Sequence, residues 1–471
     1  MKKEIQGRPG GRRITKAIAC SAWEMRTMGL KTRARAWVND QIKRLLPKGE
    51  FTRGVATLMG GTALGQGIAV LGSPVLTRLY TPDDFGVLAL YSSLLGILSV
   101  VACWRYEIAI PLPEQDEDAI NLVALSLVIL VSMGLLISLG IGFWGSQVVQ
   151  KANVPTLRSY LWLLPVGMVL VGTYEVLNYW AVRKQAFVRI AHTKLGQGIG
   201  SVASQICLGL LEVGPLGLIV GRIVGQALGV GTLATLLRGI DQKTRSAIDI
   251  GRICGMAKRY RKFPLFSSGA ALLNALGLQI PIFLLSVFYG TEVVGQFSLV
   301  QRVFGIPLSL VVTSVSQVYL SFAAVDVRNN IYNLRKLFFS TARKLCLVGT
   351  IPTVILIATG PSIFTFIFGV QWRTAGVFAQ IMAVVFFSEF VAGPLSYTFS
   401  VVERQDLSLM WNVSRLLLSG GSIYIAYRLE WSPIYAIVAY SLGMSIGYAS
   451  LFFLSARAIH SRTQLQIQRR P

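Results

Sequence analysis

Long apolar stretches without any charge alternate with short polar segments along most of this chain. Seven stretches contain no Asp, Glu, Lys or Arg: residues 54–77, 85–104, 119–150, 263–291, 303–325, 345–372 and 431–456. Each is at least as long as the roughly 20 residues that a helix needs to cross the hydrocarbon core. Membrane strands would alternate polar and apolar positions over about ten residues, and no such alternation is seen. The pattern therefore predicts an all-α integral membrane protein, because helices satisfy their own backbone groups in lipid.

The positions of the apolar runs and their breaks predict about twelve transmembrane helices. They are expected near residues 54–77, 85–104, 119–144, 157–178, 194–212, 215–238, 264–288, 293–319, 339–360, 374–399, 407–427 and 431–456. The N-terminal segment has no apolar run followed by a small-residue cleavage site, so we do not interpret it as a cleavable signal.

Composition and charge agree with a membrane protein. Only 14% of the 471 residues are charged, whereas a soluble domain has about a quarter. The net charge of +24 would suggest nucleic acid in a soluble chain, but here the basic residues flank the apolar runs. With both termini placed in the cytoplasm, cytoplasmic segments hold 37 of the 45 Lys and Arg, the opposite side five and the helices three. This asymmetry follows the positive-inside rule and indicates cytoplasmic termini and no nucleic-acid partner.

The same pattern divides the chain into two lobes. A basic tail (1–53), with an amphipathic helix at 32–48, precedes a six-helix lobe (54–238). A basic cytoplasmic loop (239–263) leads to a second six-helix lobe (264–456) and a basic tail (457–471).

A weak internal repeat relates the two lobes. An offset of 209 residues aligns five of seventeen positions in the first loop of each lobe: Tyr80, Asp83, Gly86, Leu90 and Gly96 with Tyr289, Glu292, Gly295, Leu299 and Gly305. Six helices per lobe give both lobes the same orientation, so a pseudo-symmetry axis along the membrane normal is expected. Such parallel repeats enclose a central cavity in transporters.

Several segments resemble a known family. The stretch GGTALGQGIAVLGSPVLTRLYTPDDFGVLALY (60–91) and the following RYEIAIPLP (105–113) are similar to the opening of polysaccharide-biosynthesis flippases, the Wzx-like branch of the multidrug/oligosaccharidyl-lipid/polysaccharide exporter superfamily. QRVFGIPLSLVVTSVSQVYL (301–320), IFGVQWRTAGVF (367–378) and GPLSYTFSVVERQ (393–405) are similar to later motifs of that family. The resemblance covers roughly residues 40–456.

The resemblance implies a two-lobed transporter of the bacterial inner membrane. It would move undecaprenyl-pyrophosphate-linked oligosaccharides from the cytoplasmic to the periplasmic leaflet for O-antigen, capsule or exopolysaccharide assembly. Membrane lipids, a polysaccharide polymerase and chain-length proteins are the expected partners. The sugar is not indicated.

Arginines inside the predicted helices are candidates for an anion site. A charge within a membrane helix costs roughly 2.5–3.5 kcal/mol on insertion scales and usually faces a cavity or a partner. Arginine can contact two phosphate oxygens at once, as a pyrophosphate requires. The candidates are Arg302, Arg415, Arg222 and Arg78. Each has an alternative: Arg302 pairing with a structural carboxylate, Arg415 and Arg222 reaching the head groups, Arg78 anchoring the interface.

Two carboxylates lie inside the predicted helices. Glu389 could titrate with a coupling proton, or it could pair with Arg302 or Arg415. Glu175 lies near a helix end, where a salt bridge is the commoner role. The amide side chains of these helices are most simply interhelical hydrogen-bond donors and acceptors.

The sequence argues against an enzyme. Its two histidines, His192 and His460, fall in cytoplasmic segments, and the five cysteines are scattered, so no metal site, catalytic residue or cofactor is expected. It has no GxxxxGK[ST] phosphate loop, so an ion gradient or the membrane potential would supply the energy. Two alternatives remain: a cation-coupled multidrug exporter, which needs more intramembrane carboxylates, and a membrane polymerase or ligase, which needs a large periplasmic loop.

Overall fold

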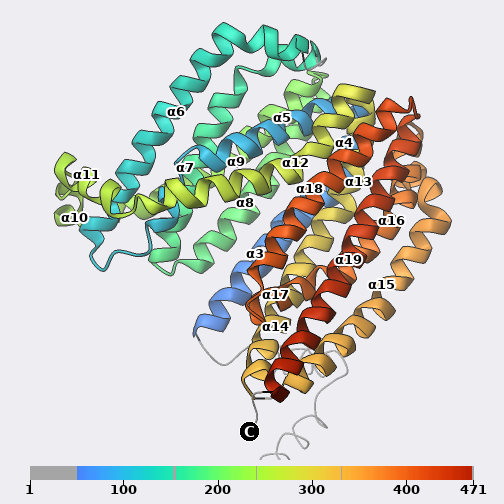
Figure 1. The fold of residues 1–471 in the computed structure, drawn as a ribbon. Helices are drawn as coiled ribbons and strands as arrows, with labels where there is room; N and C mark the ends of the chain where they lie inside the picture. The colour runs from blue at the N-terminus through green and yellow to red at the C-terminus, as the bar shows by residue number, and fades with distance from the viewer. Residues whose placement is uncertain (1–49, 152–154, 240, 330, 469–471) are drawn as a thin grey trace, which may run out of the picture. The chain divides into compact units, whose positions relative to one another are not determined.

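The computed structural model describes residues 50–151, 155–239, 241–329 and 331–468. The predicted amphipathic helix at 32–48 lies outside these residues. The chain divides into two compact units, Met1–Met59 and Gly60–Pro471. In the first unit, the described part is the beginning of helix α3 (Glu50–Leu71). Everything below concerns the second unit, whose described residues form helices joined by turns and loops, with no strand among them (Figure 1).

The first half of this unit, residues 60–238, consists of long helices joined by short turns. After α3 come α4 (Ser73–Leu79), α5 (Pro82–Val101), α6 (Asp116–Lys151), α7 (Leu163–Arg183), α8 (Phe187–Leu210) and α9 (Pro215–Arg238). Short 3-10 helices, η1 (Tyr106–Ala109) and η2 (Pro155–Tyr160), precede α6 and α7. Helix α9 packs against α8, α7 and α5.

The second half, residues 263–468, also consists of long helices joined by short segments. It contains α12 (Ser268–Tyr289), α13 (Thr291–Val300), α14 (Ile306–Asn329), α15 (Ile331–Phe368), α16 (Arg373–Ala392), α17 (Thr398–Val401), α18 (Gln405–Arg428) and α19 (Pro433–Gln468). Two π-helical segments, η3 (Phe263–Ser267) and η4 (Gln301–Gly305), and two 3-10 helices, η5 (Val370–Trp372) and η6 (Pro394–Tyr397), connect them. Helix α16 packs against α15 and α19.

Each of the twelve predicted helices overlaps a helix of the structure, and the all-α prediction is confirmed. Among the described residues, eight helical segments are long and apolar enough to cross a membrane, so the number twelve is not confirmed. Helices α3, α7, α8 and α18 overlap predicted membrane helices but are not among the eight.

The first predicted helix is interrupted. Helix α3 ends at Leu71, and α4 starts after Gly72 with Pro74 in its first turn. Proline lacks a backbone N–H and so cannot continue the hydrogen bonds of a preceding helix. The Asp84 carboxylate and the Thr81 side chain then form a capping box that starts α5.

The segment expected as a basic loop contains two short helices, α10 (Gln242–Ser246) and α11 (Ile250–Arg259). Asn121 of α6 holds the turn between them, donating to the Ala247 carbonyl at 3.0 Å and accepting from the Asp249 N–H at 3.1 Å. The Tyr106 hydroxyl donates to the Ala257 carbonyl at 3.1 Å. Apolar residues of α11, including Ile253, pack onto the first half, and its basic residues stay exposed.

The two halves meet where α5 packs against α12 and α13. A Cβ atom on Gly86 would lie 2.0 Å from the Thr291 carbonyl oxygen, and one on Gly295 would lie 1.7 Å from the Pro82 carbonyl oxygen. These two glycines are a pair of the internal repeat. The helices therefore approach each other backbone to backbone at positions where only glycine fits.

A short segment of the second half closes the same end of this junction. The indole of Trp372 in η5 donates to the Thr77 carbonyl at 3.0 Å, and the Gln371 amide donates to the same carbonyl at 2.8 Å. Gln296 of α13 donates to the Gln371 carbonyl at 2.8 Å. The Phe85 ring packs edge-on against Trp372, with ring centroids 5.0 Å apart.

Candidate functional site

A polar cavity of about 310 Å³ lies among the helices of the first half. Two cations, Arg222 of α9 and Lys194 of α8, line it, together with the amides of Gln66, Gln197 and Gln226. None of the described residues that line it is a carboxylate. The cavity therefore combines positive charge with hydrogen-bonding groups, as an anionic sugar derivative would require.

Close helix packing by glycine positions these side chains. A Cβ on Gly65 of α3 would lie 2.5 Å from the Lys194 carbonyl oxygen, and one on Gly198 of α8 would lie 2.6 Å from the Gly65 carbonyl oxygen. A Cβ on Gly225 of α9 would lie 2.8 Å from the Gln197 carbonyl oxygen. Because the backbones of α3, α8 and α9 nearly touch, the long polar side chains beside them project into the remaining space. The Gln197 amide donates to the Gln226 carbonyl oxygen at 3.3 Å.

Arg302, from the second half, lies near this cavity. It occupies the π-helical segment η4, and its guanidinium carbon is 6.0 Å from the centre of the Phe85 ring of α5. It does not line the cavity, but the charge of Arg222 acts on it. Two like charges repel, so an anion between or beside them would be stabilised by both.

Lys194 and Glu175 belong to a chain of charges that leads away from the cavity. The Lys194 ammonium lies over the Tyr174 ring, 4.6 Å from its centre, and its charge acts on Glu175 of α7. Glu175 also interacts with Arg105, which forms an ion pair with Glu107 at 3.8 Å. Glu175 is thus placed among structural charges.

The turn that holds Arg105 has an unusual backbone conformation. Trp104 and Arg105 have φ angles of 49° and 63°. These angles lie in the left-handed region, which residues other than glycine seldom adopt. One carboxylate oxygen of Glu107 and the Nε of Arg105 are buried without a hydrogen-bond partner among the described residues. Burial raises the pKa of the Glu107 carboxyl, and a backbone hydrogen bond and the charge of Arg105 partly offset this rise.

A second polar cluster lies in the second half. Arg415 of α18 donates from Nη2 to the Asn274 side-chain oxygen of α12 at 2.9 Å. Glu389 of α16 interacts with the Arg415 guanidinium and the Tyr448 hydroxyl of α19. Arg415 and Glu389 are therefore neighbours, without an ion pair within 4.0 Å between them in the described part of the chain.

The structure thus brings together only some of the predicted site residues. Arg222 lines the cavity, Arg302 is influenced by the charge of Arg222 without lining the cavity, and Arg415 belongs to the separate cluster with Glu389. Arg78 is exposed at the end of α4 and does not line the cavity.

Sequence analysis missed Lys194 as a cavity residue. The predicted helix began at residue 194, which placed this lysine at a helix end. Helix α8 begins at Phe187, so Lys194 lies about two turns inside it. Gln197 and Gln226 carried no distinguishing signal, because hydropathy does not show which face of a helix lines a cavity.

A profile of the polysaccharide biosynthesis protein family matches residues 75–376. The match covers more than half of the chain. The chain belongs to the polysaccharide biosynthesis protein family.

A curated relative supports this membership. The chain is 25% identical to the teichuronic acid biosynthesis protein TuaB of Bacillus subtilis over 226 residues, 47% of this chain and 46% of TuaB. The match thus spans about half of the relative's length.

Solved transporter structures share the fold of this family member. The lipid II flippase MurJ in an inward closed conformation has a TM-score of 0.64 at 13% identity, with 86% of this chain and 89% of MurJ covered. An inward-facing MATE family multidrug resistance transporter of the MOP superfamily has a TM-score of 0.61 at 15% identity, with 87% and 96% covered. A MOP superfamily transporter from Pyrococcus furiosus has a TM-score of 0.56 at 14% identity, with 87% and 96% covered. The chain is a multi-pass membrane protein with this transporter fold.

Proposed function

We propose that the chain is a flippase that moves undecaprenyl-pyrophosphate-linked oligosaccharides from the cytoplasmic to the periplasmic leaflet. The supporting observation is the cavity that Arg222 and Lys194 line without a carboxylate. A pyrophosphate carries at least two negative charges, and Arg and Lys recognise phosphate through charge-assisted hydrogen bonds. Cationic drugs, the cargo of the rival multidrug exporters, would be repelled there.

The size of the cavity suits the head of such a substrate. Its volume of about 310 Å³ is at the lower end of the range of roughly 300–1,000 Å³ for ligand pockets. The pyrophosphate would bind the two cations, and Gln66, Gln197 and Gln226 would hydrogen-bond adjacent sugar hydroxyls. The remaining sugars would extend towards the second half, and the polyprenyl chain would stay in the bilayer.

Substrate binding would then favour closure of the two halves. Arg222 and Arg302 belong to different halves and repel each other when the cavity is empty. An anion between them replaces this repulsion by two attractions. A ligand shifts a conformational equilibrium by its difference in affinity for the two states, and this charge change supplies such a difference.

The orientation and partners are part of the same proposal. The excess of Lys and Arg on one side supports cytoplasmic termini, in a protein of a bacterial inner membrane. Polymerase and chain-length proteins would receive the translocated units. An ion gradient or the membrane potential would drive the cycle.

A complementation experiment tests this function. In a strain without this gene, we expect lipid-linked oligosaccharides to accumulate on the cytoplasmic face and polysaccharide export to stop. The native gene should restore export, and Arg222→Gln with Lys194→Gln should not, at an equal amount of protein in the membrane. Arg238→Gln is the matched control, because Arg238 is exposed at the end of the same helix, away from the cavity. Normal export in the deletion strain, combined with drug sensitivity, would favour the multidrug exporter instead.

A further inference from the structure

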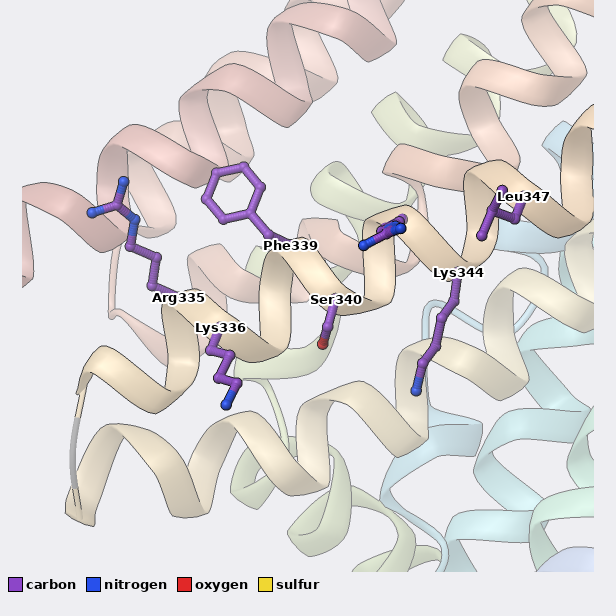
Figure 2. Close-up of a pocket in the computed structure, with 7 residues that line it drawn as sticks. Arg335, Lys336, Phe339, Ser340, Lys344 and Leu347 are labelled. Atoms are coloured by element: carbon purple, nitrogen blue, oxygen red, sulfur yellow. The ribbon is translucent and has the colours of Figure 1, made fainter.

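A basic surface covers the beginning of α15, far along the chain from the cavity residues. Four cations, Arg335, Lys336, Arg343 and Lys344, line a hollow of about 720 Å³ (Figure 2). Figure 2 shows Lys336, Ser340 and Lys344 pointing to one side of α15. The four cations occupy a band about 13 Å long, at 1.5 Å per helical residue.

These cations are free to bind an anion. All four are exposed, and none takes part in an ion pair found among the described residues. No carboxylate is among the residues that line the hollow in the described part of the chain. Some exposed cations elsewhere have partners, such as Lys184 with Asp116 and Arg404 with Asp406. Lys336 and Lys344 point to one side of α15 and Arg335 to the other (Figure 2), and a phosphate would relieve the repulsion between neighbouring cations.

An apolar groove of about 390 Å³ continues from this basic surface. It lies between α15, α16 and α19 and shares Phe339 and Arg343 with the basic hollow. Its walls include Phe387, Val391 and Phe452. The Phe339 ring faces that of Phe452, with centroids 6.3 Å apart. The groove is therefore formed by packed helices and has a cation at its entrance.

The surroundings of the groove are those of a lipid-facing surface. The charge-free run of α15 begins at Leu345, directly after Lys344. Leu347 is 65% exposed and Phe453 is 69% exposed beside the groove. The surface of α15 thus changes from basic to apolar between Lys344 and Leu345. Such a change is expected at the boundary between lipid head groups and acyl chains.

From this arrangement, we infer that the beginning of α15 with the α15–α16–α19 groove binds one anionic phospholipid of the cytoplasmic leaflet. The phosphate head group would lie among the cations of this segment, with Arg343 at the entrance of the groove, and one acyl chain would fill the groove. Basic pockets between helices at the cytoplasmic side are suited to anionic head groups. No residue of this site lines the polar cavity, so the site is separate from the proposed path of the substrate.

Lipid titration of the full chain in detergent tests the head-group half of the inference. After removal of co-purified lipid, native mass spectrometry would measure binding of dioleoyl phosphatidylglycerol and dioleoyl phosphatidylcholine. We expect the native chain to prefer phosphatidylglycerol. Replacing the four cations by Gln should reduce this preference at least about tenfold. The matched control replaces Lys258, Arg259, Arg261 and Lys262, four exposed cations of the segment around α11, by Gln and should keep the preference.

A groove variant tests the acyl-chain half. Ala449 is exposed and lines the groove, so Ala449→Phe fills it without changing a charge or the buried core. We expect this variant to bind phosphatidylglycerol at least several-fold more weakly. Glycerol phosphate, which has the head group without acyl chains, should not compete at equal concentration. An unchanged preference in the four-cation variant, equal loss in the control, or full competition by glycerol phosphate would each overturn the inference.

Discussion

The charge of single residues decides what the polar cavity can bind. Arg222 and Lys194 line it, and Arg302 approaches from the second half. Sequence analysis selected Arg222 and Arg302, because a charge inside an apolar run is conspicuous. It could not select Lys194, Gln66, Gln197 or Gln226. Whether these side chains line the cavity depends on how α3, α8 and α9 are rotated about their axes.

Arg302 gives the clearest prediction at this scale. Arg302→Gln should reduce polysaccharide export about tenfold, because a hydrogen bond to a charged group contributes about 1.5–3 kcal/mol. Arg302→Lys should give an intermediate value, since lysine keeps the charge and loses the two-pronged geometry. Export and membrane protein amount would be measured together in complemented cells. Export at the native level in Arg302→Gln would remove this residue from the substrate site.

The buried Glu107 carboxyl should make the stability of the folded chain depend on pH. Burial raises the pKa of its carboxyl, so the folded chain binds this proton more tightly than the unfolded chain. Its contribution to stability is fullest below the ordinary pKa of 4.5 and is lost as pH rises through the raised pKa. The melting temperature of Glu107→Gln minus that of the native chain should therefore increase as pH rises. Thermal unfolding followed by tryptophan fluorescence would measure both values. The exposed Glu114→Gln should show no such trend. A difference that shrinks with pH would contradict the burial of this carboxyl.

Individual helices were largely predictable, and their contacts were not. The apolar runs located every long helix because each must cover about 30 Å of hydrocarbon. The interruption at Gly72, the π-helical segments and the two helices in the 239–263 segment were not predicted. Each depends on local backbone geometry or on a tertiary contact such as that of Asn121, which hydropathy does not record.

The close contact between helices α5 and α13 should be sensitive to the size of the side chain at position 295. Gly295→Ala places a Cβ where the Pro82 carbonyl oxygen lies, and overpacking of this kind costs about 1–3 kcal/mol. We expect a lower melting temperature in detergent and reduced export. Gly231→Ala in α9 is the control, because nothing lies within 4 Å of its Cβ position. That control should be neutral or slightly stabilised, since alanine favours helix more than glycine does. Equal melting temperatures for both variants would show that the helices do not approach so closely.

At the scale of the whole molecule, fold and family agree with the function proposed from the cavity. The internal repeat was weak in the sequence, yet its glycine pair Gly86 and Gly295 lies face to face between the halves. The resemblance of short motifs pointed to the family that the match over residues 75–376 established. The substrate could not be predicted in this way, because the motifs indicate the family and not the sugar.

Translocation by the purified protein tests the central proposal most directly. The full chain would be reconstituted into liposomes that carry an undecaprenyl-pyrophosphate-linked oligosaccharide, and a membrane-impermeant lectin would report the units that become exposed. The native protein and Arg238→Gln should expose them well above protein-free liposomes, and Arg222→Gln with Lys194→Gln should not. Exposure by the native protein no faster than in protein-free liposomes, with a membrane potential and an ion gradient applied, would contradict the proposed function.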